Sequence, residues 1–199
     1  MKTLEDHGID ETIFNFDQIH QIKKGLENNV DILIYADLKF NAHQMYQIRK
    51  GLENRVDVSI YVDPVFSGTK MEQIRLGLEH EVDASIYADT KYDGKQMEQI
   101  RLGLENKLDV SIYMNSIIGP QQMEQIRLGL KEGLDVSIYA DPKFDHSQMF
   151  QIRLGLKKGI DASVYADSKF NSKQMRQIRK GLEQEMISNP IDTNSMSLF

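Results

Sequence analysis

The chain has 199 residues, of which 40% are hydrophobic and 27% are charged, which is the composition of an ordinary soluble protein. The absence of cysteine excludes disulfides and thiolate metal sites, and the net charge of -6 argues against a surface that attracts polyanions. No apolar run reaches the roughly 20 residues of a membrane-spanning helix, so we expect no membrane segment.

The chain begins with MKTLEDHGIDET, a polar and acidic stretch that has no apolar core of the kind found in signal peptides. We therefore expect a cytoplasmic protein. Residues 1–13 share no clear pattern with the rest of the chain, and we treat them as an N-terminal lead-in.

A seven-residue motif then recurs: QIRLGLE stands at 73–79 and at 99–105, and QIRLGLK at 125–131 and 151–157. The motif begins every 26 residues, at Gln21, Gln47, Gln73, Gln99, Gln125, Gln151 and Gln177. A fixed period of this length is typical of solenoids, whose stacked repeats share one core. We predict a single solenoid over 14–187, with six full repeats and a partial repeat at each end, followed by a disordered tail at 188–199.

The first half of each repeat has the signals of a helix. In FDHSQMFQIRLGLKKG, Asp145 suits the N-cap position and Gln148 completes a capping box, while Phe144 and Met149 form a hydrophobic staple. Gly159 stands where a glycine ends a helix. The expected helix has about 13 residues, or about 20 Å at 1.5 Å per residue.

The second half, LDVSIYADPKF, begins at Leu134 and fits two structures. Apolar and polar residues alternate up to Ala140, which indicates a strand and an α/β horseshoe like that of leucine-rich repeats. Asp135 could equally cap a short helix with Val136 and Tyr139 on its inner side, which indicates an all-α solenoid. Periodicity over so few residues leaves both structures open.

A resemblance favours the second structure. The segment QMEQIRLGLENKLDVSIY at 96–113 resembles tandem repeats of the type QMxxIRxGLxxGLDVSxYADPxF, which occur in phage and conjugative-element proteins of Gram-positive gut bacteria. The resemblance covers nearly all of 14–187. It implies an all-α, short-repeat solenoid with one long helix and a short helix or 3-10 turn per repeat, in a mobile-element setting. It implies no particular activity.

A glycine recurs inside every predicted helix, where it costs about 1 kcal/mol relative to alanine. Its recurrence indicates the close approach of a neighbouring backbone or of the tyrosine ring found later in each repeat. These glycines are Gly25, Gly51, Gly77, Gly103, Gly129, Gly155 and Gly181. The tyrosines, which we expect in the core rather than stacked on nucleotide bases, are Tyr35, Tyr61, Tyr87, Tyr113, Tyr139 and Tyr165.

A basic residue also recurs on the helix, and an aspartate recurs eight residues after it. We predict that they form a structural ladder of charge pairs between repeats, with a phosphate-binding stripe as the alternative. The ladder comprises Arg49, Arg75, Arg101, Arg127, Arg153 and Arg179, preceded by Lys23, with Asp57, Asp83, Asp109, Asp135 and Asp161, preceded by Asp31.

Towards the C-terminus, the glutamates that flank the earlier arginines are replaced. We expect an incompletely neutralised, partner-binding surface there, centred on Phe150 because the position before each QI should face solvent. Its predicted members are Phe150, Arg153, Lys157, Lys158, Lys173, Arg176, Arg179 and Lys180, with Ile117 in the irregular segment MNSIIGP as a separate contact point.

The five histidines are scattered, no glycine-rich phosphate loop occurs, and the carboxylates are periodic rather than unique. We therefore expect no catalytic residues, metal site or cofactor. The expected function is that of a non-enzymatic repeat scaffold that binds another protein, as a phage or mobile-element factor that acts on a host protein. The alternative is a nucleic-acid-binding repeat protein that uses the arginines, which the negative net charge disfavours.

Overall fold

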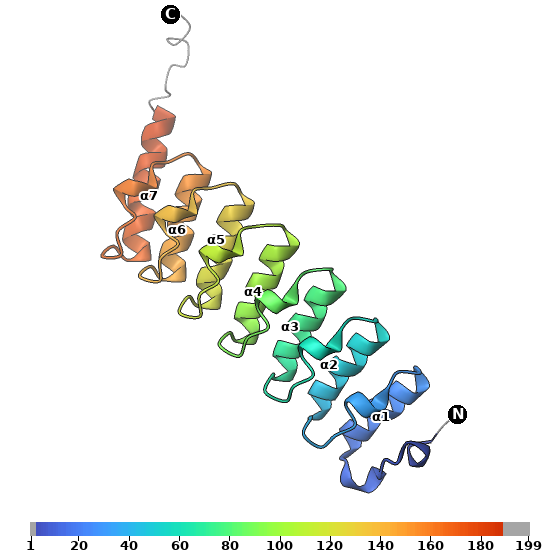
Figure 1. The fold of residues 1–199 in the computed structure, drawn as a ribbon. Helices are drawn as coiled ribbons and strands as arrows, with labels where there is room; N and C mark the ends of the chain where they lie inside the picture. Colours follow the sequence, from blue (N-terminus) through green and yellow to red (C-terminus); the bar gives the residue numbers. More distant parts are fainter. Residues whose placement is uncertain (1–2, 189–199) are drawn as a thin grey trace, which may run out of the picture. The chain divides into compact units, whose positions relative to one another are not determined.

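A computed structural model describes residues 3–188, and all of its regular elements are helices (Figure 1). No strand occurs within these residues, so the prediction of an all-α repeat is confirmed and the horseshoe alternative is wrong. The predicted disordered tail lies, apart from Ser188, outside the described residues. The chain forms two compact units, Met1–Lys107 and Leu108–Phe199, here called the N-terminal and C-terminal units.

The N-terminal unit contains 3-10 helices η1 Glu5–His7, η2 Glu11–Ile13, η3 Ile32–Ile34, η4 Val58–Ile60 and η5 Ala84–Ile86, and α-helices α1 Phe16–Glu27, α2 Ala42–Glu53, α3 Gly68–Glu79 and α4 Gly94–Glu105. The C-terminal unit contains η6 Val110–Ile112, η7 Val136–Ile138 and η8 Ala162–Val164, and α5 Pro120–Lys131, α6 His146–Lys157 and α7 Ser172–Ser188. Helices α1 to α6 each have 12 residues, one fewer than predicted, and α7 has 17.

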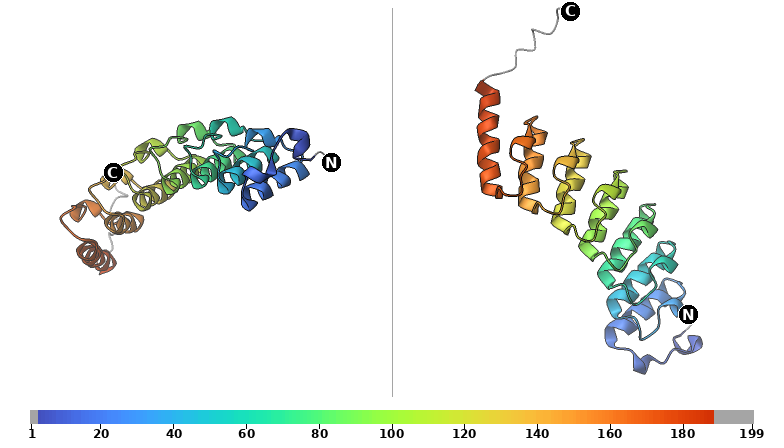
Figure 2. Two further views of the ribbon diagram at one scale, coloured as in Figure 1. Left: turned by 90° about the horizontal axis from the view of Figure 1, so that it is seen from below. Right: turned by 60° about the vertical axis from the view of Figure 1, so that its left-hand side comes forward.

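Within each unit, consecutive α-helices pack against one another, and the 3-10 helices line one side of them (Figure 2). Helix α2 contacts α1, α3 and the 3-10 helix η4 of its own repeat, and α6 likewise contacts α5, α7 and η8. Each repeat therefore contributes one long and one short helix to a two-layered stack.

The predicted caps are present. Asp145 accepts a hydrogen bond from the backbone N–H of Gln148 at 2.8 Å, and Gln148 Oε1 accepts one from the N–H of Asp145 at 2.7 Å. The glutamine has a second function, because its Nε2 donates to the carbonyl of Phe170 in the next repeat at 2.8 Å. The capping box thus also joins neighbouring repeats.

A left-handed residue stands just after the end of each of helices α1 to α6. In the C-terminal unit this residue is a glycine, as predicted, and Gly159 has φ of 72°. In the N-terminal unit the same place is taken by Asn29, Arg55, Glu81 and Lys107, with φ between 56° and 61°. The chain turns back there, and the backbone N–H of the next residue donates to a carbonyl of the helix, as that of Val56 does to the carbonyl of Gly51 at 3.0 Å.

The core repeats one set of side chains. A methionine, an isoleucine and a tyrosine from successive repeats are fully buried, for example Met71, Ile74 and Tyr87. The lead-in at 1–13 is folded where it is described, and its Leu4 and Ile9 are buried together with Phe14.

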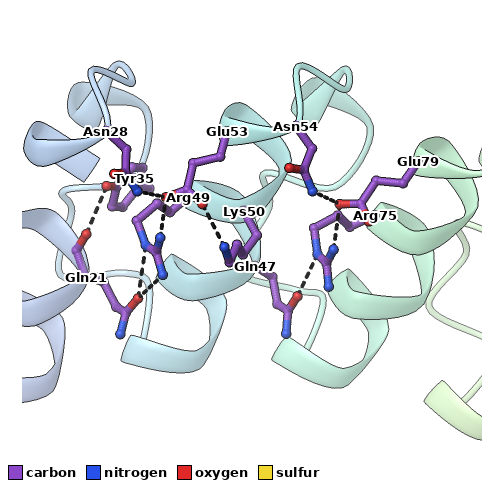
Figure 3. Close-up of polar contacts among 10 residues, drawn as sticks. All are labelled: Gln21, Asn28, Tyr35, Gln47, Arg49, Lys50, Glu53, Asn54, Arg75 and Glu79. Atoms are coloured by element: carbon purple, nitrogen blue, oxygen red, sulfur yellow. Dashed lines mark hydrogen bonds and ion pairs between the residues drawn. The ribbon is translucent and has the colours of Figure 1, made fainter. Parts of the chain in front are cut away.

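The helix glycine lies against the tyrosine of the same repeat, which is one of the two close neighbours that were predicted, the other being a neighbouring backbone. A Cβ atom at Gly25 would lie 1.9 Å from the hydroxyl oxygen of Tyr35, and this hydroxyl donates to the carbonyl of Gln21 at 3.1 Å (Figure 3). Gly129 and Tyr139 repeat the arrangement in the C-terminal unit. The helix glycine therefore makes room for a buried phenol, which is core packing and not a base-stacking surface.

We predict that alkaline pH unfolds the protein cooperatively. Burial raises the pKa of Tyr35, Tyr61, Tyr87, Tyr113 and Tyr139, and raises that of Tyr165 to about 12. An unfolded tyrosine has a pKa of about 10. The stability linked to these phenols is fully present below that pH and is lost as the pH rises through the folded-state values. Tyrosinate absorbance and helical circular dichroism should change together in this range. Gradual ionisation with helicity retained would contradict the prediction.

Candidate protein-binding surface

Five of the recurring arginines each donate to a glutamine of the preceding helix and so join two helices: Arg49, Arg75, Arg101, Arg153 and Arg179. Arg75 on α3 donates from Nε to Gln47 Oε1 on α2 at 2.9 Å, and from Nη1 to Glu79 one turn further along α3 at 2.5 Å (Figure 3). Arg49 makes the same two contacts, with Gln21 and Glu53. Arg75 is only 8% exposed, so the guanidinium is part of the interior.

The carboxylate of Glu53 is held in the charged form. Burial raises the pKa of Glu53, but hydrogen bonds from Lys50, Asn28 and Arg49 outweigh it, and the pKa lies below its ordinary value. Asn54 gives Glu79 a similar bond, at 2.7 Å (Figure 3). A buried charge is stable when it is paired and hydrogen-bonded in this way.

The predicted aspartate partners are wrong. Asp57 is exposed and caps η4, where its Oδ1 accepts a hydrogen bond from the N–H of Ser59 at 3.0 Å. An aspartate at the start of a short helix satisfies a backbone donor there and is not available to the arginine. Asp31, Asp83, Asp109, Asp135 and Asp161 cap their 3-10 helices in the same way.

The burial of the arginines contradicts the predicted phosphate-binding stripe and removes two members from the predicted C-terminal partner-binding surface. Arg49, Arg75, Arg101, Arg127, Arg153 and Arg179 are all buried, at 6–9% exposure. A phosphate-binding stripe needs exposed guanidinium groups, so these residues do not offer one. Arg153 and Arg179 are likewise unavailable as surface contacts in the predicted C-terminal set.

The expected lack of neutralisation is wrong for four members of the predicted set, Arg153, Lys157, Lys158 and Arg179. Glu132 pairs with Arg153 at 2.8 Å and with Lys157 at 2.7 Å, and Glu183 pairs with both Arg179 and Lys158. Lys131 and Lys157 stand where earlier repeats have the glutamate that pairs with the arginine. Glu132, which follows Lys131, pairs with Arg153 of the next helix instead. The remaining predicted members, Lys173, Arg176 and Lys180, are exposed residues of α7.

Phe150 is 39% exposed and Tyr46, at the same place in its repeat, is 37% exposed, as predicted for the position before QI. Each ring also lies against the buried arginine of its own helix, with 5.7 Å from the Arg153 guanidinium to the Phe150 ring centre. Part of each aromatic ring therefore shields a guanidinium. Ile117 is 74% exposed.

The most regular exposed apolar feature, which was not predicted, is the third residue of each of the 3-10 helices η3 to η8. These residues, called the aliphatic row, are Ile34, Ile60 and Ile86 in the N-terminal unit and Ile112, Ile138 and Val164 in the C-terminal unit. Ile86 is 41%, Ile112 39% and Val164 56% exposed, and the other three are partly buried. The sequence contains a signal for this row, because an aliphatic residue comes directly before each recurring tyrosine. This residue is not among those that the short-helix prediction places on the inner side.

Comparison with protein-family models, with curated proteins and with solved structures found no match. Within residues 3–188 no helix has the length and apolar character needed to cross a membrane. The same residues contain no cluster of three or more histidine, aspartate or glutamate side chains placed to hold a metal ion.

Proposed function

We propose that this protein is a non-enzymatic repeat scaffold that binds another protein. The observation that supports it best is the aliphatic row, which presents apolar side chains at the same place in successive repeats. Such residues gain little from exposure, and they bury apolar area when a partner covers them. Solenoids commonly bind along extended surfaces of this kind. The resemblance to mobile-element repeats adds the proposal that the partner is a bacterial host protein.

The alternative of nucleic-acid binding has less support. The residues that would have contacted phosphates are buried and paired, and the net charge of -6 opposes a polyanion. A complex with DNA or RNA tighter than about 10 μM at physiological salt would exceed ordinary non-specific affinity and would favour the alternative.

The test compares two triple variants in affinity capture from a Gram-positive bacterial lysate. The first, Ile86→Ser with Ile112→Ser and Val164→Ser, changes the most exposed members of the aliphatic row. The control, Leu38→Ser with Val65→Ser and Ile187→Ser, changes aliphatic residues outside the row that are at least as exposed overall. We expect the parent and the control to retain the same protein, identified by mass spectrometry, and the row variant to lose it.

Circular dichroism first establishes that both variants are folded. Phe150→Ala is a third arm, and loss of the retained protein in that arm alone would move the binding surface to Phe150. Failure of the parent to retain any protein above an unrelated solenoid would contradict the proposed function.

A further inference from the structure

Each member of the aliphatic row has a carboxylate beside it. The aspartate that caps a 3-10 helix stands three residues before the row residue, as Asp57 does before Ile60 and Asp161 before Val164. The aspartate lies one residue before the 3-10 helix, and in one repeat the backbone N–H of Ile86 donates to the carbonyl of Asp83 at 3.4 Å, so the two residues are close neighbours. The six aspartates are all exposed. The surface therefore carries one aliphatic side chain and one carboxylate per repeat, three times in each unit.

Of the five aspartates that recur six residues later in the repeats, three are neutralised by a lysine, whereas Asp63 and Asp167 form no ion pair within the described part of the chain. The neutralised ones, Asp37, Asp89 and Asp141, form ion pairs with Lys39, Lys91 and Lys143 at 2.9–3.1 Å. Among residues 3–188, none of the aspartates that precede the aliphatic row forms an ion pair. The row is thus accompanied by negative charge that the protein itself leaves uncompensated.

Hydrogen bonds lower the pKa of three of these carboxylates, those of Asp57, Asp135 and Asp161, and so favour their charged form. The Ser137 hydroxyl donates to Asp135 Oδ1 at 2.6 Å and the backbone N–H of Ser137 donates at 3.0 Å, and these bonds lower the pKa of Asp135. Asp161 has the same two bonds from Ser163, and its pKa is lowered for the same reason. One oxygen of each carboxylate is used in this way, and the side chain as a whole stays exposed.

We infer that, within each unit, the aliphatic row and its three aspartates form a docking surface for a basic protein segment in which lysine or arginine accompanies regularly spaced aliphatic residues. The inference rests on the proposed function and specifies its partner. Opposite charges steer such a segment to the surface and set its register, and the aliphatic contacts supply burial. A second copy of this acidic chain fits less well, because like charges would meet.

The spacing of the repeats suggests the form of the segment. Packed helices lie about 8–10 Å apart, and five of the 3-10 helices, η3, η4, η5, η7 and η8, contact the α-helix of their own repeat. Seven residues of an α-helix rise about 10.5 Å and return to nearly the same face. An amphipathic helix with one aliphatic residue in seven, flanked by basic residues, therefore presents its side chains at about the interval of the row.

The test measures binding of a synthetic 21-residue helical peptide, roughly three heptads with one leucine in each and lysine beside it. The aspartate variant changes the six aspartates to asparagine, which keeps the caps and removes the charges. Its substitutions are Asp31→Asn, Asp57→Asn, Asp83→Asn, Asp109→Asn, Asp135→Asn and Asp161→Asn. The control removes the same charge elsewhere, with Glu5→Gln, Glu27→Gln, Glu81→Gln, Glu98→Gln, Glu124→Gln and Glu185→Gln.

Fluorescence anisotropy at low salt should show binding to the peptide that is at least about tenfold weaker for the aspartate variant and less than about threefold weaker for the glutamate control. A peptide with serine in place of leucine, and one with glutamate in place of lysine, should both bind the parent weakly. Equal weakening in the two variants would show that net charge alone governs binding and would overturn the inference.

The inference and the proposed function can fail separately. If the parent does not bind the peptide, yet captures a protein that the aliphatic variant loses, the partner is not a basic segment and the proposed function stands. If the parent captures a protein that does not depend on the row, only the inference is overturned, and if it neither binds the peptide nor captures any protein, both are overturned.

Discussion

Replacing Gly155 by alanine should destabilise the protein by about 3 kcal/mol, although alanine is the better helix former. The new Cβ would lie 1.8 Å from the hydroxyl oxygen of Tyr165 and 3.1 Å from the ring carbon that bears it. The fully buried tyrosine would have to move, and its bond to the carbonyl of Gln151 would be lost. Thermal and urea unfolding would measure the loss.

The chain offers a matched control at Gly181, the equivalent glycine of α7. A Cβ there meets no atom within 4 Å. Gly181→Ala should therefore stabilise the helix by up to about 1 kcal/mol. Adding Tyr165→Phe to Gly155→Ala removes the clashing oxygen and should restore part of the lost stability. Similar effects of the two alanine substitutions would contradict the assigned role of the tyrosine.

Replacing Arg75 by alanine should cost about 3 kcal/mol, because it leaves a buried amide and a carboxylate without their donor. Gln47 is 1% exposed and Glu79 is partly buried, so water replaces the guanidinium poorly at both. Arg176→Ala, at an exposed arginine of α7, should change the stability by less than about 0.5 kcal/mol. Chemical unfolding of both variants tests the difference, and equal melting would mean that Arg75 is not structural.

A double-mutant cycle tests which carboxylate the arginine uses. Asp83→Ala removes the cap of η5 and should cost about 1 kcal/mol. Because Arg75 and Asp83 share no contact, the two losses should add within about 0.5 kcal/mol, whereas Arg75→Ala with Glu79→Ala should not be additive. Strong coupling between Arg75 and Asp83 would contradict the pairing of Arg75 with Glu79 and would support the predicted pairing of arginine with aspartate.

Local chemistry explains why much of the fold was predictable. The capping box of Asp145 and Gln148, the glycine at the end of α6 and the 26-residue period are all determined by neighbours along the chain. The recurring helix glycine indicated a close neighbour, and the tyrosine of the same repeat is only ten residues away. These features required no knowledge of how one repeat sits on the next.

The partners of the arginines depended on that packing. Gln47 lies 28 residues before Arg75, and nothing in its local sequence marks it as the acceptor. Aspartate, glutamate and glutamine all recur with the same period as the arginine. The period therefore cannot show which of them accepts hydrogen bonds from the guanidinium.

The sequence by itself determined the repeat, the helix boundaries to within a residue or two and the identity of the core tyrosines. Only the tertiary structure decided that the DVSIY segment is a 3-10 helix, that Asp57 caps it and faces solvent, and that Ile60 is left partly exposed. The physical reason is that a strand and a single helical turn satisfy so short a pattern equally well. The choice between them is made by the tyrosine that must reach the glycine of the helix before it.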